Sequence, residues 1–324
     1  MTSTTICLNA VCTGRVRTDN KNRPGNPGLV RKPRACQGTP GLSGNSGLFR
    51  KPRALFLLLP VILEYHSPME RRLKDLKNFL DEKADQFNNP EFIALDPVQI
   101  PHAYTRKEDI EIAGFLAAVI SWGNRTSIIK NAKRMLAFMG DSPHDFILNH
   151  NEHDLRKAEG FVHRTFNADD LLAFIEGLSH LYRDANGLEG VFEKYQTDDS
   201  LQPAIHELKK EFFAGPHLER SRKHLPDPLT GSAAKRINMY LRWMIRKDNC
   251  GVDFGIWKNI SPAKLSCPLD VHSGNIARRL GILSRKQNDA KAVQELDAVL
   301  RQMDPADPVK YDFALFGLGV YQQF

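Results

Sequence analysis

Apolar residues recur at helical spacing through most of residues 69–324. The first helix is predicted by an apolar stripe made of Leu73, Leu76, Phe79 and Leu80. A continuous apolar run over residues 112–120 falls within a helix expected at Asp109–Trp122, which indicates a buried central element. No alternating run reaches strand length, so the pattern predicts an all-α fold.

Turn and capping signals place the other helices. Thr105 and Glu108 form a capping-box pattern ahead of the central helix. The polar turn Ser121–Arg125 ends that helix, and a further helix is expected up to Met139. Later helices are expected from Ser142, over Asn167–Tyr182, over Leu201–Phe213, from Asn288 and from Pro308.

Residues 1–68 differ in composition from the rest of the chain. They contain an imperfect repeat, GNPGLVRKPRA at 25–35 and GNSGLFRKPRA at 44–54, and no hydrophobic periodicity. Ten Lys and Arg stand against two Asp and Glu, a net charge of +8. Such a stretch cannot bury enough apolar surface to fold, so we expect a disordered basic tail. It either grips nucleic acid without specificity or is upstream sequence, with translation starting at Met69.

Charge divides the remaining chain into two parts. Residues 69–220 hold 19 Lys and Arg against 26 Asp and Glu, and residues 221–324 hold 16 against 10. The sequence therefore predicts an acidic helical lobe followed by a basic lobe. A phosphate-binding face would have this basic character, although chance imbalance in a helical domain would give it too.

The sequence lacks the motifs of membrane proteins, zinc enzymes and nucleotide-binding proteins. No segment approaches the length of a membrane span, so we expect a cytoplasmic monomer without membrane contact. The cysteines Cys250 and Cys267 form no C-x-x-C pair, and the histidines show no zinc-enzyme spacing. Phosphate-loop and dinucleotide motifs are absent as well, and we expect no metal and no cofactor.

The stretch from Leu225 to Ile282 contains the candidate chemistry. A Pro- and Gly-rich turn leads to a helix expected to begin near Ser232, which can cap it, and Lys235 then falls in the first turn. Asp270 precedes a second helix, expected over His272–Leu280 and ended by Gly281.

A lysine and an aspartate at the starts of two helices make a plausible catalytic pair. The Lys235 amine would be a nucleophile, and the Asp270 carboxylate would stabilise a developing cation. The positive end of the helix dipole and Arg236 favour the neutral amine, whereas Asp270 opposes it. The alternative is a solvated surface lysine and an ordinary capping aspartate.

The segment Pro268-Leu269-Asp270-Val271-His272, with Arg278 and Arg279 following, resembles the motif of helix-hairpin-helix DNA glycosylases. The 8-oxoguanine branch is nearest, and the segment is most similar to a bacterial branch of the superfamily. Gly231-Ser232-Ala233-Ala234-Lys235 matches the hairpin glycine and the lysine that follows it. Two features depart from the pattern: the hairpin keeps one glycine, and Asp248–Cys267 looks inserted.

The resemblance implies a two-lobed helical domain that acts on double-stranded DNA with a damaged base. Lys235 would form a Schiff base and Asp270 would be the catalytic carboxylate of a base-excision N-glycosylase with AP-lyase activity. The implied DNA contacts are Gly231, Ser232, Arg236, His272, Arg278, Arg279, Asn124 and Arg125. The residue pattern leaves two alternatives open, a non-catalytic helix-hairpin-helix DNA-binding protein and an interaction module that never touches nucleic acid.

Overall fold

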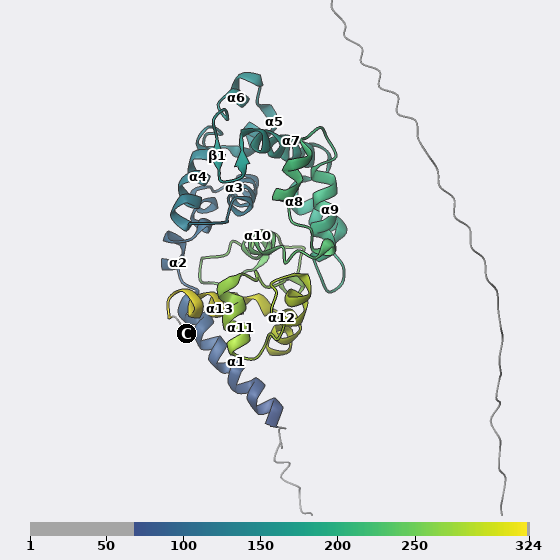
Figure 1. The fold of residues 1–324 in the computed structure, drawn as a ribbon. Coiled ribbons are helices and arrows are strands. Elements are labelled where there is room, and N and C mark those ends of the chain that lie inside the picture. The colour runs from purple at the N-terminus through teal and green to yellow at the C-terminus, as the bar shows by residue number, and fades with distance from the viewer. Residues whose placement is uncertain (1–67, 323–324) are drawn as a thin grey trace, which may run out of the picture. The chain divides into compact units, whose positions relative to one another are not determined.

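The computed structural model describes residues 68–322, and the expected tail lies outside these residues. The described part of the chain is built from thirteen α-helices (Figure 1). They are α1 Pro68–Phe87, α2 Glu91–Ala94, α3 Lys107–Val119, α4 Arg125–Ala137, α5 Pro143–Asn149, α6 Glu152–Arg156, α7 Ala168–Asp184, α8 Gly187–Tyr195, α9 Gln202–Phe212, α10 Lys235–Ile245, α11 Val271–Arg279, α12 Ala290–Met303 and α13 Tyr311–Val320.

Short 3₁₀ turns and one small hairpin complete the described fold. The turns are η1 Pro97–Gln99, η2 Pro101–Ala103, η3 Glu219–His224, η4 Pro228–Thr230, η5 Pro262–Lys264 and η6 Pro308–Lys310. β1 Val162–His163 pairs with β2 Phe166–Asn167 in antiparallel orientation, and these two strands make up the sheet in residues 68–322. The prediction of an all-α protein is confirmed.

Two helix starts differ from the sequence prediction. α10 begins at Lys235 with Ala234 as its N-cap residue, and no side chain caps it. The Ser232 hydroxyl accepts instead from the Ala234 N–H, two residues along the chain, and so closes the preceding turn. α3 begins at Lys107, and its N-cap Arg106 gives no side-chain cap, so the capping box predicted at Thr105 is wrong. α10 therefore begins three residues after Ser232, and α3 begins two residues before the expected Asp109.

The buried apolar side chains form two clusters. The first, which we call the upper cluster, joins α3 to α9 with α10 and extends through residues 252–265. Its centre is α3, in which every residue from Asp109 to Val119 is buried, as the apolar run predicted. α3 packs directly against α10. Figure 1 shows α10 below α3 and at the lower boundary of this group of helices.

The second cluster, which we call the lower cluster, brings the two ends of the described chain together. α1 packs along α13, α13 packs on α11, and α12 closes the group (Figure 1). The division between the clusters therefore does not follow the charge boundary at residue 220. α1 belongs with the C-terminal helices because its stripe, which includes Leu80, packs there. α10 belongs with the N-terminal helices because Tyr240 and Trp243 are fully buried against them.

The segment between α10 and α11 belongs to the core. Phe254 N–H donates to the Trp243 carbonyl at 2.8 Å, and Trp257 N–H donates to the Met244 carbonyl at 3.0 Å. The Trp257 indole donates to the buried carboxylate of Glu111 at 2.7 Å. The chain thus returns along α10, and this return brings Asp270 back to the level of Lys235.

Candidate catalytic site

The turn before α10 fixes the position of Lys235. η4 ends at Gly231, whose φ of +102° is a left-handed conformation that favours glycine. The Gly231 carbonyl accepts from the Ala290 N–H at 3.1 Å, which ties the turn to the start of α12. Ala234 is also left-handed, with φ 47° and ψ 31°, a conformation that strains a residue with a Cβ atom. Lys235 follows directly as the first residue of α10.

Asp270 is held at the start of α11. Its Oδ1 accepts from the Ser273 N–H at 2.9 Å and from the Ser273 hydroxyl at 3.2 Å, so the predicted N-cap is confirmed. The Asn288 side-chain amide donates to the Asp270 carbonyl at 2.7 Å, and Arg278 donates to the other end of that amide at 2.6 Å. Oδ1 and the backbone of Asp270 are thus fixed, and Oδ2 is left for another partner.

That partner is Lys235. The distance from Lys235 Nζ to Asp270 Oδ2 is 3.8 Å, and the side chains are 30 % and 19 % exposed. Within residues 68–322 the Lys235 amine forms this ion pair and no hydrogen bond. Both residues line a cavity of about 490 Å³ and a second, shallower one of about 420 Å³. The fold therefore brings the two predicted catalytic residues together at the wall of a ligand-sized cavity.

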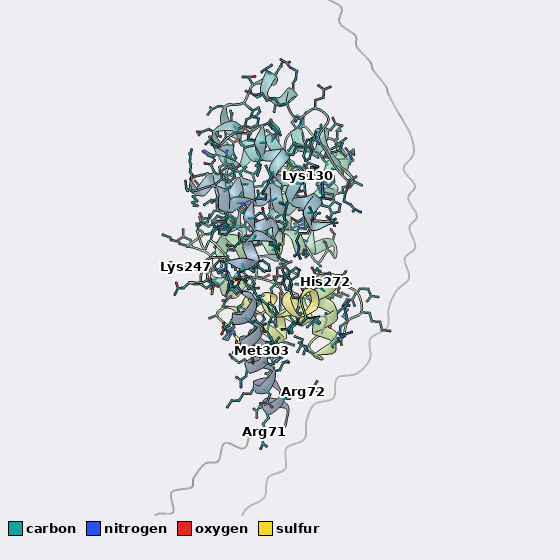
Figure 2. All side chains as sticks on the ribbon, turned by 90° about the vertical axis from the view of Figure 1, so that its left-hand side faces the viewer. Arg71, Arg72, Lys130, Lys247, His272 and Met303 are labelled. Carbon is teal, nitrogen blue, oxygen red and sulfur yellow. The ribbon has the colours of Figure 1, made fainter. Side chains whose placement is uncertain are left out.

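The larger cavity lies between residues of the two clusters. α2, α4 and α10 contribute residues on one side, and α11 and α13 contribute residues on the other. Its aromatic lining consists of Phe92, Trp122 and Phe316. His272 lies at its edge, where its ring meets Phe316 edge-on at 6.4 Å. Figure 2 shows His272 at the level between Lys130 of the upper helices and Met303 of the lower helices.

Arg236 forms part of the cavity wall. Its guanidinium lies 4.8 Å from the centre of the Trp122 ring and donates to the carbonyls of Val119 and His224. Burial lowers the pKa of Arg236 to about 10, so the group stays charged at neutral pH. These contacts turn its charge inward and fix the face of Trp122 that borders the cavity.

The turn between α3 and α4 supplies two further predicted contacts. The Asn124 side chain accepts from the Ser127 N–H at 3.1 Å and caps α4. Arg125 lines the cavity with its guanidinium 5.2 Å from the centre of the Phe316 ring. Arg125 therefore lines the cavity, whereas the side chain of Asn124 is used to cap α4.

The remaining predicted DNA contacts lie in the turn before α10, at the start of α10 and at the end of α11. Gly231, Ser232 and Arg236 line the smaller cavity. Arg278 donates to the Arg285 carbonyl at 2.8 Å and to Asn288, so its guanidinium holds the α11–α12 connection. Arg279 is exposed at the end of α11. A phosphate-binding role for these residues stays a prediction.

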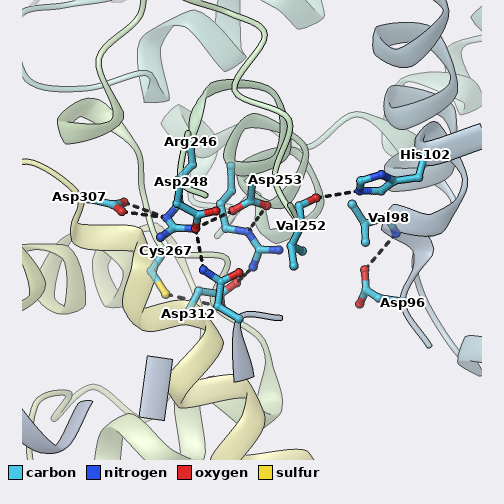
Figure 3. A network of polar contacts seen from close by, with 12 residues as sticks. Asp96, Val98, His102, Arg246, Asp248, Val252, Asp253, Cys267, Asp307 and Asp312 are labelled. Atoms are coloured by element: carbon cyan, nitrogen blue, oxygen red, sulfur yellow. Dashed lines mark hydrogen bonds and ion pairs between the residues drawn. The ribbon is translucent and has the colours of Figure 1, made fainter. Parts of the chain in front are cut away.

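Two of the basic residues near the motif, Arg242 and Arg246, are deeply buried, and Figure 3 shows the carboxylates around Arg246. Arg242 donates to Asp312 and, at 3.2 Å, to Asp253. Arg246 donates to Asp307 at 2.9 Å, to Asp253 at 3.1 Å and to Asp248. These carboxylates all come from residues 221–324, so both guanidinium groups pair within the basic part of the chain. The network joins α10 to the start of η6 and to α13.

Sequence reasoning missed two buried carboxyl groups in the cavity, Asp96 and Asp312. Burial raises the pKa of both, that of Asp312 to about 6. Asp312 stands alone in the apolar run of α13, and a lone charge in such a run signals a buried partner. Asp96 precedes Pro97 as an ordinary capping residue, so nothing in its sequence context indicates the cavity.

Two general properties of residues 68–322 bear on the site. No three His, Cys, Asp or Glu side chains there gather as a metal ion would require. No helix in this part of the chain is long and apolar enough to cross a membrane.

Comparison with known proteins gives one match. No curated protein and no solved structure matches the chain. A family model, described as a protein of unknown function (DUF2400), matches residues 96–321, which include Lys235, Asp270 and most of the cavity lining. This match covers well over half of the sequence, and the chain therefore belongs to the DUF2400 family.

Proposed function

We propose that this protein is a base-excision DNA glycosylase with AP-lyase activity, built on a two-lobed helix-hairpin-helix glycosylase fold. One observation carries the proposal: Lys235 Nζ lies 3.8 Å from Asp270 Oδ2 at the wall of a cavity of about 490 Å³. The two residues are distant in sequence, and each stands at the start of a helix beside a turn. The resemblance of the motif to the glycosylases assigns them the roles of nucleophile and carboxylate.

In the proposed reaction a damaged nucleotide is flipped from the duplex into the larger cavity. Asp270 takes a proton from the Lys235 ammonium and passes it to the departing base, and the carboxylate so regenerated stabilises the positive charge that develops on the sugar. The Lys235 nitrogen bonds to C1′ as the bond to the base breaks, and the base leaves with the electron pair and takes up a proton. The sugar then opens to a Schiff base, from which loss of a C2′ proton expels the 3′ phosphate.

The position of the second cavity favours the binding of duplex DNA at this site. This cavity lies beside the uncapped start of α10, where the helix dipole favours an anion such as a phosphate group. The left-handed, strained Ala234 directly before Lys235 is the kind of backbone feature that accumulates at active sites. These features add support to the lysine–aspartate pair and do not carry the proposal by themselves.

Borohydride trapping on a duplex with an abasic site tests the proposal. The wild-type protein should give a covalent adduct, and Lys235→Ala should lower its yield at least about 1,000-fold, since one residue supplies the nucleophile. The matched control is Lys247→Ala, which removes an exposed lysine just beyond the end of α10 (Figure 2). An equal adduct in Lys235→Ala would exclude this amine as the nucleophile.

Asp270→Asn separates chemistry from capping at the second residue. Asparagine caps helices about as well as aspartate, so α11 should keep its start while the carboxylate charge is lost. We expect the trapping rate to fall about 100- to 1,000-fold and the melting temperature to change by about 2 °C or less. A variant that binds duplex DNA normally and traps at the wild-type rate would show that the carboxylate is only a cap.

The single hairpin glycine favours a second candidate, a helix-hairpin-helix protein that binds DNA without chemistry. It predicts duplex binding that weakens with salt, no adduct with any abasic duplex, and no effect of Asp270→Asn beyond about 1 kcal/mol of stability.

A further inference from the structure

The larger cavity contains a carboxyl group that the lysine–aspartate chemistry does not use. Asp96 is 7 % exposed and lines the cavity from the start of η1. Its Oδ1 accepts from the Val98 N–H at 3.0 Å (Figure 3). Within residues 68–322 this is the one hydrogen bond of the carboxyl group, which forms no ion pair, so Oδ2 has no partner there.

The other buried aspartates near the cavity are differently placed. Asp253 and Asp312 each accept from a buried guanidinium. Burial raises the pKa of Asp96, and the charges of Arg242, Arg125 and Lys235 offset this only in part. The Asp96 carboxylate borders the cavity, and its Oδ2 accepts no hydrogen bond within residues 68–322, so this oxygen is open to a donor from a ligand.

Arg125 offers the complementary group. It lines the same cavity, half-buried, with its guanidinium against the Phe316 ring at 5.2 Å from the centre. The described residues supply no hydrogen-bond acceptor and no carboxylate to it. Its charge offsets part of the rise that burial causes in the pKa of Asp96, and both groups line the same cavity. The cavity therefore presents an open acceptor and an open donor to a ligand.

We propose that Asp96 and Arg125 read the edge of the flipped base, and that the cavity selects bases with a lactam edge. Asp96 Oδ2 accepts from the ring N–H, and Arg125 donates to the carbonyl oxygen beside it. Uracil, hypoxanthine and oxidised guanine present this edge, whereas 1,N6-ethenoadenine has no N–H there. The inference rests on the proposed glycosylase function and names its substrate class.

Asp96→Asn is a matched change, because it replaces one atom at the cavity wall. The amide oxygen keeps the bond from the Val98 N–H, and the amide nitrogen then puts a donor where the carboxylate offered an acceptor. Arg125→Met removes the other contact while keeping an apolar chain against Phe316. Since Arg125 holds no other described element by a polar bond, this second variant should fold even if Asp96→Asn does not.

The experiment uses the full-length protein and two kinds of duplex. One kind carries uracil, hypoxanthine, 8-oxoguanine or ethenoadenine, and base release is measured in single turnover. The other carries a preformed abasic site, and borohydride adduct is measured. Because an abasic site has no base to contact, the two readouts separate recognition of the base from the chemistry at Lys235.

We expect wild-type protein to release at least one lactam base and to leave ethenoadenine in place. Asp96→Asn should slow that release at least about 100-fold, since a site built to bind an N–H group then meets it with a donor. Arg125→Met should slow it at least about tenfold. Asp96→Asn should trap the abasic duplex within about twofold of wild type, and Arg125→Met, which also removes an expected DNA contact, should lose base release more than trapping.

Three results would overturn the inference while leaving the lyase proposal intact. They are trapping without release of any lactam base, release of ethenoadenine at a similar rate, and equal loss of release and trapping in folded variants. Absence of both release and trapping in the wild-type protein would overturn the proposed function and this inference together.

Discussion

The two ends of α10 carry positive charge in opposite settings. At its first residue, Lys235 is 30 % exposed and meets one carboxylate at 3.8 Å. Toward its end, Arg242 and Arg246 are buried and bonded to four carboxylates, at positions 248, 253, 307 and 312. The Lys235 amine borders a cavity and makes no hydrogen bond with residues 68–322, whereas the guanidinium groups of Arg242 and Arg246 are paired with carboxylates.

The start of α10 therefore carries a candidate reactive group, and the rest of the same helix carries charges that hold the fold together. A buried guanidinium that is bonded to two or more carboxylates is held in place, and it fixes the elements that carry its partners. An amine with a single loose ion pair contributes little to stability and remains open to react. The buried network therefore sets the spacing of the two clusters, and the open pair uses the cavity that this spacing leaves.

The largest expected effect breaks the scaffold end. Arg242→Ala should lower the free energy of unfolding by about 3–5 kcal/mol, because Asp253 and Asp312 lose the guanidinium between them while remaining buried. Lys247→Ala, which removes an exposed charge nearby, should change it by about 0.5 kcal/mol or less. Urea unfolding of both variants measures the difference, and a loss below about 1 kcal/mol for Arg242→Ala would show that the network is not a scaffold.

A buried acid outside the network gives an intermediate effect. Burial raises the pKa of Asp297 to about 6, although Arg301 lies 3.6 Å away. Between about pH 4 and pH 6 the folded protein therefore keeps Asp297 protonated, whereas the unfolded chain has released this proton. The stability from this proton is fully present below about pH 4 and is lost as the pH rises through 6.

Asp297→Asn has no such proton to lose. From about pH 3.5 to about pH 7, a range that spans the unfolded-state and folded-state pKa values of Asp297, the stability of wild type relative to Asp297→Asn should fall by about 2–3 kcal/mol. Unfolding curves at several pH values give this difference directly. A difference that stays constant, or rises with pH, would contradict a raised pKa at Asp297.

The smallest expected effect concerns charges around the open end. Lys286 is exposed between α11 and α12, near the smaller cavity. If it neutralises a phosphate, Lys286→Ala should reduce the slope of log affinity against log salt by about 1. Lys130→Ala, on the upper helices and apart from His272 in Figure 2, should leave the slope unchanged. A slope equal in both variants would remove Lys286 from the DNA interface.

Much of the fold follows from local pattern. The apolar stripe of α1, the buried run of α3 and the cap at Asp270 depend on neighbouring residues, and the structure has them where the sequence predicts. The start of α10 was misplaced because Ser232 bonds back into the turn at Ala234. The membership of α1 in the lower cluster could not be predicted, since it depends on contacts with α13, at the other end of the described chain.

Some residues of the candidate site could likewise be predicted from local sequence, and others could not. Lys235 and Asp270 stand in recognisable helix starts, so their motif could be found in the sequence, and the structure confirms that they meet. Asp96 caps the short turn η1 and Arg125 is the first residue of α4, and only the packing of the fold places them at one cavity. The burial of Arg242 could not be predicted from its neighbours in sequence, because its partners, Asp253 and Asp312, lie on separate segments.

The most direct test of the account is to locate the covalent bond. Wild-type protein reduced with borohydride on an abasic duplex is digested, and the peptide that carries the sugar remnant is identified by mass spectrometry. The open end of α10 predicts that the modification lies on Lys235, with Lys247 and the other lysines unmodified. A remnant on another lysine or on the N-terminal amine, or no remnant at all, would contradict the assignment of Lys235 as the reactive end of the helix.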